Sequence, residues 1–350
     1  MSLDFDYPLF LKPEELDALL ERGWFRMRDT VFTTHYYLRD GLLLSTVWLR
    51  SDLQNYQFTK SQRRKLRQLH QKYSITFAPL KLTAEHEDLY KKYLTIAKGD
   101  RSDTIKNILE DVDGLIFTSI MQEIRDPEQE NRLIAFSIFD IGRESLESIV
   151  GIYDPKYSDD SLGVFTMFLE VEYAIQAGYR WYYIGYFTPG FDAFDYKLRL
   201  GHLSFYDPDQ KQWFQMQDFS IASLWSTIHI QKLMELCDFL KEKGIQSRIM
   251  LNQHYDTIVL NGLGDRYLDE PIFLDLRIRN HSIGQLCYYS MKNREFELVL
   301  ADYEARKLMA HNPQQKYPNG WPIHSALIRK IHFLTVSSDI EALFLDIFGG

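Results

Sequence analysis

The sequence predicts an α+β fold in which helices accompany a mixed sheet. Three apolar runs lie between residues 115 and 155, and short polar turns separate them, which is typical of an antiparallel meander. A helical pattern follows over residues 161–178, where Ser161 is the expected N-cap and Gly178 the expected end. An aromatic strand begins directly afterwards at Trp181. Several strands, a helix and a further strand therefore indicate one sheet with helices beside it.

The stretch Trp181–Lys197, WYYIGYFTPGFDAFDYK, joins that last strand to a polar loop. It begins with aromatic and β-branched residues, which suit a half-buried strand, and it breaks at Thr188-Pro189-Gly190, where Pro fixes φ and Gly permits a positive φ. The loop then presents Asp192, Asp195, Tyr196 and Lys197. Strands that end in such loops often place reactive groups. An aromatic core strand with a solvated exit fits the same residues, because most aromatic runs lie in cores.

The composition limits the classes of protein that the chain can represent. Its 350 residues are enough for two or three domains, and 40 Lys and Arg against 49 Asp and Glu give a net charge of −9, so any polyanion site must be a local patch. The two cysteines, Cys237 and Cys287, form no CxxC pair, which excludes a four-cysteine metal site and fits a reducing compartment. The N-terminus has no secretory pattern and no apolar run is long enough to span a membrane. We expect a cytoplasmic protein without a membrane partner.

Helices and strands are also expected before the meander. Residues 13–22 have a helical pattern, and residues 24–50 have the composition of strands with a hairpin turn at Asp40-Gly41. Residues 83–111 are again helical in pattern.

The segment Phe58–Tyr73, FTKSQRRKLRQLHQKY, has the densest positive charge of an acidic chain. It predicts a helix capped by Ser61, with a narrow apolar stripe at Leu66 and Leu69. The residues that we expect to contact a nucleic-acid backbone are Lys60, Ser61, Gln62, Arg63, Arg64, Lys65 and Arg67. Several cations acting together bind phosphates, although a solvated helix face would have the same composition.

The pattern of predicted helices and strands changes after about residue 217. It predicts a helix at 224–243, five strands between 245 and 301 with a hairpin near Lys292-Asn293, and helices at 303–311 and 323–332. We find no catalytic constellation there, because the histidines lack the spacing of metal ligands. They are His254, His281, His311, His324 and His332.

Three segments together resemble the aminoacyl-tRNA–protein transferases, a family with arginyl-transferring and bacterial leucyl-transferring branches. The segments are FTKSQRRKL, SIVGIYDPKYSDDSLGVFTMFLEVEYAIQAGYRWYYIGYF and GFDAFDYKLRLGHLSFYDPDQKQW. The matching positions are Ser61, Gln62, Arg63, Arg64, Tyr153, Asp154, Pro155, Ser161, Leu162, Gly163, Glu172, Gly185, Tyr186, Gly190, Tyr196 and Lys197. The resemblance covers roughly residues 15–215, and it rests on the order and spacing of the motifs rather than on any one of them.

The resemblance implies a fold and a division into domains. The fold is the acyl-CoA N-acyltransferase (GNAT)-like mixed sheet with helices, followed here by a C-terminal α+β extension. We expect an N-terminal module with the basic helix at residues 1–80, a GNAT-like catalytic domain at 81–217 and an additional region of unknown role at 218–350.

The sequence departs from the family at two places. The cysteines that the family carries near its N-terminus are absent, since Tyr36, Tyr37 and Leu38 occupy that region, and no metal cluster is expected. In the loop after the aromatic strand, the family's Cys, Lys and Met correspond to Phe191, Ala193 and Phe194. Tyr196 and Lys197 are retained.

The resemblance also implies a reaction, the transfer of an aminoacyl group from the 3′ ester of aminoacyl-tRNA to the N-terminal α-amine of a protein or peptide. The ester is already activated, so no cofactor, ATP or metal is required. The reaction needs orientation of the amine, a proton acceptor and donors for an oxyanion. We expect the backbone at Gly185 or Tyr186 to supply an oxyanion donor and Asp192 or Asp195 to act as base or to bind the acceptor amine. Tyr196 would donate to the leaving ribose oxygen and Lys197 would hold phosphate. The expected pocket residues are Tyr153, Asp154, Ser161, Glu172, Gly185 and Gly190.

Three other functions remain open from the sequence. A CoA-dependent N-acyltransferase would need a Gly-rich pyrophosphate loop, whereas PKYSDDSLG has two acids and one Gly before the helix. An inactive tRNA- or peptide-binding relative would fit the changes at Phe191 and Ala193. A transferase acting on a different amine would leave the same pattern.

Overall fold

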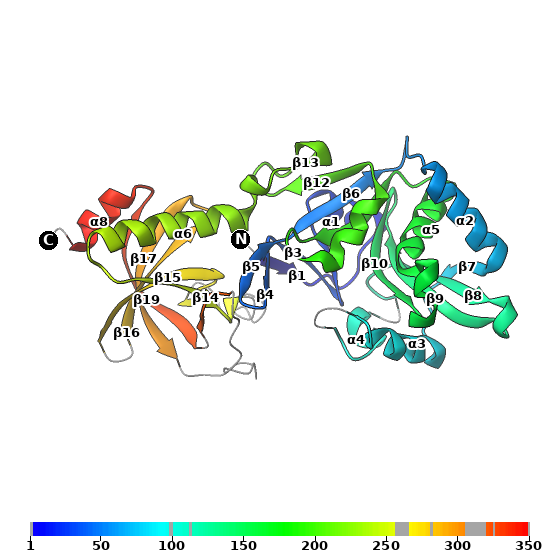
Figure 1. The fold of residues 1–350 in the computed structure, drawn as a ribbon, viewed down its shortest axis with the longest axis horizontal. Coiled ribbons are helices and arrows are strands. Elements are labelled where there is room, and N and C mark those ends of the chain that lie inside the picture. The colour runs from blue at the N-terminus through cyan, green and yellow to red at the C-terminus, as the bar shows by residue number, and fades with distance from the viewer. Residues whose placement is uncertain are drawn as a thin grey trace. The chain divides into compact units, whose positions relative to one another are not determined.

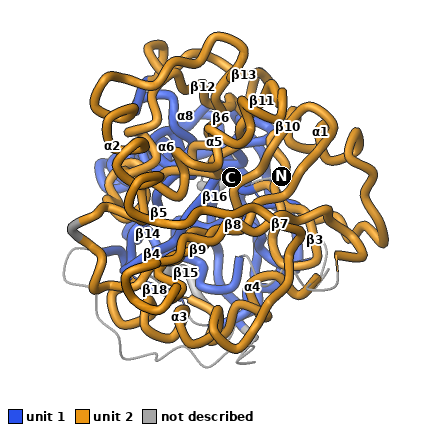
Figure 2. Tube along the Cα trace, turned by 90° about the vertical axis from the view of Figure 1, so that its right-hand side faces the viewer, with its two compact units in different colours: residues 1–4, 34–46, 220–350 blue, residues 5–33, 47–219 orange. Residues whose placement is uncertain are grey.

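The computed structural model describes residues 3–97, 101–111, 114–255, 266–280, 283–304, 320–324 and 326–348. The chain forms two compact units, which are coloured separately in Figure 2. We call residues 5–33 and 47–219 the N-terminal unit, and residues 1–4, 34–46 and 220–350 the C-terminal unit. The division at residues 80 and 217 stays a prediction.

The N-terminal unit is built on an eight-stranded sheet with the order β13-β12-β6-β11-β10-β9-β8-β7 (Figure 1). Its strands are β6 (Val47–Asp52), β7 (Ser74–Pro79), β8 (Ser119–Asp126), β9 (Arg132–Ile141), β10 (Ser145–Tyr153), β11 (Trp181–Phe187), β12 (Leu203–Asp207) and β13 (Gln212–Gln215). Neighbours are antiparallel except β10 and β11, which are parallel. The predicted meander and mixed α+β sheet are confirmed.

Short strands and helices complete this unit. The short strands are β1 (Leu3–Asp6), β2 (Phe25–Met27) and β3 (Thr30–Thr34), of which β1 begins and β3 ends in residues of the C-terminal unit. The α-helices are α1 (Pro13–Glu21), α2 (Lys60–Lys72), α3 (Ala84–Leu94), α4 (Ile105–Leu109) and α5 (Leu162–Ala177). The 3₁₀-helices of this part of the chain are η1 (Pro127–Gln129), η2 (Pro155–Asp160), η3 (Asp192–Leu200) and η4 (Met216–Asp218). Helix α5 connects the parallel strands and packs on β9 and β10, and it ends as predicted at Gly178, whose φ of 84° suits glycine.

The N-cap predicted for the basic helix is wrong by two residues. Thr59 caps α2, because its Oγ1 accepts the Gln62 N–H at 3.3 Å and the Gln62 Oε1 accepts the Thr59 N–H at 2.7 Å. This reciprocal pair is a capping box, which Ser61 inside the first turn cannot form.

The C-terminal unit contains a six-stranded sheet of order β18-β14-β15-β16-β17-β19, the hairpin β4–β5 and a long helix, α6. Their bounds are β4 (Tyr36–Arg39), β5 (Leu42–Ser45), α6 (Trp225–Glu242), β14 (Arg248–Asn252), β15 (Ile272–Asn280), β16 (Ile283–Ser290), β17 (Glu295–Glu304), β18 (Ile323–His324), β19 (Leu327–Ser337) and α8 (Ile340–Phe348), with η5 (Ile221–Ser223) before α6. The hairpin turn predicted at Asp40-Gly41 is confirmed, and both residues have a positive φ.

Contacts with α6 hold this hairpin in the C-terminal unit. The Tyr36 hydroxyl lies 2.9 Å from Nδ1 of the buried His229, and Ser45 Oγ donates to Ser226 Oγ at 2.8 Å. Residues 34–46 therefore pack with a segment that follows them by about half the length of the chain.

The helix predicted at 323–332 is wrong, because β18 and β19 occupy that region. Strand β19 pairs antiparallel with β17, and its buried Leu327 and Ile328 belong to the sheet. A short apolar run does not distinguish a strand from a helix by its period, so pairing with β17 decides the structure. All but the first residue of the strand predicted at 255–260, and most of the helix predicted at 303–311, lie outside the described residues, and residues 303–304 belong to β17.

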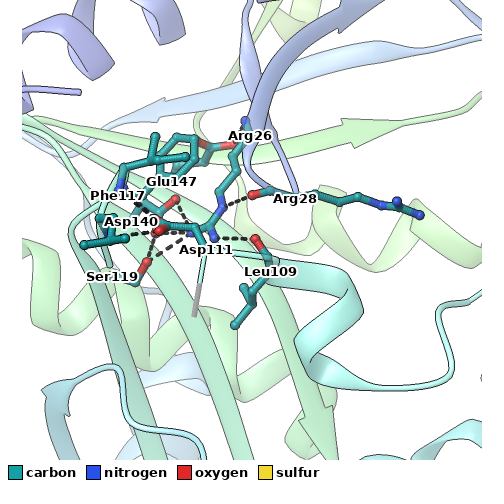
Figure 3. Close-up of polar contacts among 10 residues, drawn as sticks. Arg26, Arg28, Leu109, Asp111, Phe117, Ser119, Asp140 and Glu147 are labelled. Carbon is teal, nitrogen blue, oxygen red and sulfur yellow. Dashed lines mark hydrogen bonds and ion pairs between the residues drawn. The ribbon is translucent and has the colours of Figure 1, made fainter. Parts of the chain in front are cut away.

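A buried ion pair joins β2 to the large sheet of the N-terminal unit. Arg26 Nη1 lies 3.0 Å from Asp140 Oδ1 on β9, and both side chains are fully buried. The same nitrogen donates to Ser119 Oγ on β8 at 3.1 Å, and the guanidinium lies 4.3 Å from the centre of the Phe117 ring (Figure 3). Burial of a charge is costly unless it is paired and hydrogen-bonded, and here both conditions are met.

Further contacts of Arg26 reach α4 and β10. Its Nη2 donates to the Leu109 carbonyl at 2.9 Å, and its backbone N–H donates to Glu147 Oε1 at 2.8 Å (Figure 3). Burial and the charge of Asp140 raise the pKa of Glu147 to about 8. One arginine thus connects β2, β8, β9, β10 and α4.

Replacing Asp140 with Ala should lower the free energy of unfolding by about 3–5 kcal/mol, because it leaves the Arg26 guanidinium buried without its carboxylate. Urea denaturation measures the loss. The double variant Arg26→Met/Asp140→Leu should recover much of it, since it removes both charges. Asp88→Ala, which breaks the exposed pair with Lys91, is the control and should cost less than about 1 kcal/mol. Equal losses in the two single variants would contradict the structural role of the buried pair.

Candidate functional site

The parallel strands β10 and β11 separate partway along their length. They pair only from Ser145–Glu147 to Trp181–Tyr183, whereas β10 remains paired with β9 through Tyr153 and β11 with β6 through Phe187. We call the region beyond Glu147 and Tyr183 the fork. In the described part of the chain no strand lies between the facing strand edges of the fork, so their backbone groups are open to other partners.

Backbone irregularities on both strands accompany the fork. The register of β11 with β6 shifts between Tyr183 and Gly185, and that of β10 with β9 shifts between Ser148 and Val150. Such bulges bend a strand and re-aim its side chains. Gly185 has a φ of 79°, a left-handed conformation that glycine adopts without strain.

The amine of Lys197 lies against this bulge. Its Nζ donates to the Tyr186 carbonyl at 2.7 Å and lies 3.0 Å from the point where a Cβ on Gly185 would be. Burial and, secondarily, the positive charge of Arg101 lower the pKa of Lys197 to about 7. The side chain is therefore partly a neutral amine near neutral pH.

Tyr196 reaches into the same region from η3. Its side chain is 37% exposed overall, but its hydroxyl end is buried, and burial raises the pKa of Tyr196. Tyr93, Arg101 and Glu170 are close enough to influence that pKa electrostatically. Tyr93 in turn contacts the ring of Tyr153, with 5.5 Å between ring centres.

Glu170 on α5 lies at the base of the fork and was not predicted from the sequence. It is 1% exposed and accepts a hydrogen bond from the Tyr182 hydroxyl on β11 at 2.7 Å. It also bonds to Ser137 on β9 and Ser148 on β10, and burial raises the pKa of Glu170 to about 7. A glutamate within the buried stretch of an apolar helix was the signal that could have identified it.

Several predicted site residues lie elsewhere in the N-terminal unit. Glu172, two positions after Glu170, faces α2 and pairs with His70 at 2.6 Å. Asp154 is buried and accepts hydrogen bonds from Arg132 Nη2 at 2.5 Å and from the Lys156 N–H at 3.0 Å. These three contacts join neighbouring elements rather than face the fork.

The remaining predicted residues occupy turns and the exposed loop. Ser161 begins α5 with a φ of 56° and makes no side-chain cap bond, and Gly190 turns the chain with a φ of 89°. Asp192 and Asp195 are exposed on η3. The structure thus brings Gly185, Tyr186, Tyr196 and Lys197 together, with Tyr153 joined to them through Tyr93.

Helix α2 presents a positive face beside this loop. Lys65 and Lys72 pair with Asp160, at 3.4 and 2.9 Å. On α2, the exposed lysines and arginines for which the described residues supply no ion pair are Lys60, Arg63, Arg64 and Arg67. Gln62 Nε2 donates to the Arg199 carbonyl of η3 at 3.2 Å, so the start of the helix is attached to the loop.

A mixed sheet with one parallel pair, a helix connecting that pair and a fork between its strands has the architecture of the GNAT-like acyltransferases. Residues 85–210 match the family model "Arginine-tRNA-protein transferase, C terminus". This match and the curated relatives show that part of the chain is similar to the aminoacyl-tRNA–protein transferases.

The matching relatives include three proteins named aspartate/glutamate leucyltransferase from different genera. The proteins from Leptospira interrogans and Ruegeria pomeroyi are 27% identical over 175 and 201 residues, which are 47% and 55% of this chain and 66% and 70% of theirs. The protein from Hyphomonas neptunium is 31% identical over 140 residues, 39% of this chain and 55% of its own. The alignment with the Leptospira protein thus spans just under two thirds of that relative.

Solved structures give weaker likenesses. FemX matches with a TM-score of 0.32 and 12% identity over 51% of this chain and 60% of its own. L-PGS from Bacillus licheniformis matches with a TM-score of 0.31 and 12% identity over 50% and 52%. Scores this low support no argument about function.

Two negative findings concern the described residues. Within them, no helix has the length and hydropathy needed to cross a membrane. Nor do His, Cys, Asp or Glu side chains in the same part of the chain form a group that could hold a metal ion.

Replacing Glu170 with Gln should flatten the pH dependence of stability between pH 4.5 and about 7. The pKa of Glu170 is raised by burial, so the folded state holds a proton that the unfolded state has lost. The stability that this proton supplies is present below pH 4.5 and is lost as the pH rises to about 7. Urea titrations at several pH values measure the difference from wild type. The exposed Glu144→Gln is the control, and an E170Q curve parallel to wild type would contradict the expectation.

Proposed function

We propose that this protein transfers an aminoacyl group from aminoacyl-tRNA to the N-terminal α-amine of an acceptor protein, an N-degron-type modification in the cytoplasm. The similarity of residues 85–210 to the arginine-tRNA-protein transferase model, and the names of the relatives, support this reaction. The observation that carries the proposal is the amine of Lys197, held in the fork beside Gly185 and Tyr186 with its pKa lowered to about 7. A lysine of that pKa is suited to accept a proton near neutral pH.

The reaction then follows from the groups around the fork. Lys197 accepts a proton from the acceptor's α-ammonium, and the freed nitrogen attacks the ester carbonyl. A backbone N–H at Gly185 or Tyr186 stabilises the oxyanion. As the C–O bond to the ribose breaks, Tyr196 donates a proton to the leaving oxygen, and the attacking nitrogen gives up its second proton, which restores the Tyr196 hydroxyl. An amide bond replaces the ester bond, and the tRNA leaves with a free hydroxyl.

This scheme changes the role expected for Lys197 and keeps one of the two roles expected for Asp192 and Asp195. Lys197 acts as the base instead of holding phosphate, because its Nζ is buried against the Tyr186 carbonyl. Asp192 and Asp195 are exposed on η3, where they are suited to attract the acceptor ammonium.

The names of the relatives indicate the finer specificity that we propose. They suggest leucyl transfer to acceptors with N-terminal Asp or Glu, and the positive charge of Arg101 near Lys197 and Tyr196 favours an acidic side chain there. The family model bears an arginyl name, so arginyl-tRNA is the second donor to test.

A CoA donor fits the first turn of α5 less well. A Cβ at Gly163 would lie 2.7 Å from Cε1 of Tyr153, so the tyrosine ring packs directly on this turn. Asp160 immediately precedes it and already binds Lys65 and Lys72. This helix start is therefore covered and flanked by a carboxylate, which does not favour a pyrophosphate.

The assay combines the full chain with leucyl-, arginyl-, phenylalanyl- or lysyl-tRNA and peptides that begin with Asp, Glu, Arg or Lys, and reads the peptide mass. We expect kcat/KM to rise with pH and to level off above about 7, as Lys197 loses its proton. Lys197→Arg retains the charge but cannot act as a base at this pH, so transfer should fall by roughly 100-fold or more.

The exposed Lys211→Arg is the control and should behave as wild type. A K197R enzyme with the wild-type rate and pH profile would remove Lys197 from the mechanism. Binding of tRNA without transfer in any pair would favour the inactive relative.

Neutralising Arg63, Arg64 and Arg67 together with Gln should weaken tRNA binding and reduce its salt dependence. Loss of three phosphate contacts lowers the slope of log K against log salt by roughly 2 to 3. Fluorescence anisotropy with labelled tRNA at several salt concentrations measures both effects. The matched control neutralises three exposed cations of α3 and α4, namely Lys91, Lys92 and Lys106. Equal slopes in both triple variants would mean that α2 is a solvated face.

A further inference from the structure

A row of aromatic rings extends from strand β11 onto the loop that follows it. Two of these rings, Phe191 and Phe194, stand at positions where this sequence differs from the aminoacyl-tRNA–protein transferases. Phe191 contacts Phe194 with 5.4 Å between ring centres, and Phe194 contacts Tyr186 at 5.3 Å. Tyr186 in turn packs edge-on to the buried Trp48 at 4.9 Å. We call Phe191, Phe194 and Tyr186 the aromatic platform. All three are half-buried, so the platform is anchored in the core and keeps part of its surface open.

The platform borders the reactive amine. Lys197 Nζ lies 5.4 Å from the centre of the Phe194 ring and 5.5 Å from that of Tyr186. Further apolar surface on η3 comes from Tyr196 and Leu198, each 37% exposed. A planar group resting on the platform would therefore lie close to the fork.

The positive face of α2 is attached to the other end of the same loop. Gln62 Nε2 donates to the Arg199 carbonyl at 3.2 Å, and the Tyr56 hydroxyl donates to the Leu200 carbonyl at 2.8 Å. A row of cations for a backbone, followed by aromatic rings for bases, is the combination that binds single-stranded nucleic acid.

We propose that the aromatic platform stacks a base at the single-stranded 3′ end of the donor tRNA and so brings the ester to the fork. This inference rests on the donor named in the proposed function. The platform could hold either a base or the apolar side chain of the transferred amino acid. The positive charge of α2 favours a base, because the phosphates attached to a base bind cations and an apolar side chain does not. Phe194, central in the platform, carries most of the stacking.

The test uses an RNA hairpin that carries no amino acid and has a four-nucleotide single-stranded 3′ end. Its last base is 2-aminopurine, and the fluorescence of 2-aminopurine falls when the base stacks on a ring. Wild type should quench this probe, and Phe194→Leu should lose most of the quenching and bind roughly 5- to 100-fold more weakly. Its salt slope should stay at the wild-type value, because no phosphate contact is lost. Phe194→Trp should restore quenching, which shows that the ring is required and that the loop tolerates substitution.

Phe214→Leu, a half-buried phenylalanine on β13, is the matched control and should quench like wild type. Unchanged quenching in both Phe194→Leu and Phe191→Leu would overturn the proposal. The proposal would also be overturned if Phe194→Leu left the quenching unchanged but altered the preference between leucyl- and phenylalanyl-tRNA as donors. The platform would then contact the amino acid.

Because the RNA carries no amino acid, the quenching result does not depend on whether the protein transfers an aminoacyl group. A protein that quenches the probe but transfers nothing retains the platform and loses the proposed reaction. An active transferase whose quenching does not depend on the platform retains the reaction and loses the platform.

Discussion

Past Glu147 and Tyr183 the strands β10 and β11 no longer share hydrogen bonds, while each remains paired with its other neighbour. An opening in the middle of a sheet is unfavourable unless other groups satisfy the exposed backbone. Here the Lys197 amine satisfies the Tyr186 carbonyl. The candidate site is therefore a gap within the sheet, and its position is fixed by where pairing between β10 and β11 stops.

Polar side chains support the base of the fork from both faces of the sheet. Tyr182 and Tyr183 point to opposite faces, as successive strand residues do. On the α5 face, Glu170 bonds to Tyr182 on one strand and Ser148 on the other. On the opposite face, Glu147 accepts the backbone N–H of Arg26, whose side chain pairs with Asp140. Because buried polar groups need specific partners, these contacts restrict how far the strands can shift.

The sequence was sufficient for the meander and the helix and strand that follow it, but not for the strands at 323–332 or for the geometry of the fork. The meander, the helix ended by Gly178 and the turn at Asp40-Gly41 follow from local patterns, and the structure contains them. The bulge before Gly185 depends on pairing between β11 and β6, which are far apart in the chain. A one-dimensional pattern contains no such information.

The site residues illustrate the same limit. Glu170 and Glu172 are two positions apart on α5, so they lie on different faces, and only the first is buried against the sheet. The resemblance selected the second. Likewise, Lys197 was identified from the sequence, but its burial beside Gly185, and hence its lowered pKa, required the folded loop.

The chain path has a consequence for synthesis. The hairpin of residues 34–46 belongs to the C-terminal unit, and residues 47–219 separate it from the rest of that unit. Tyr36 and Ser45 find their partners on α6, which leaves the ribosome much later. Until α6 has been synthesised, the hairpin lacks its packing partner. The N-terminal unit must therefore fold with this unpacked hairpin inserted in its sequence. A chain shortened to residue 219 would retain the fork but display the unmatched side of this hairpin.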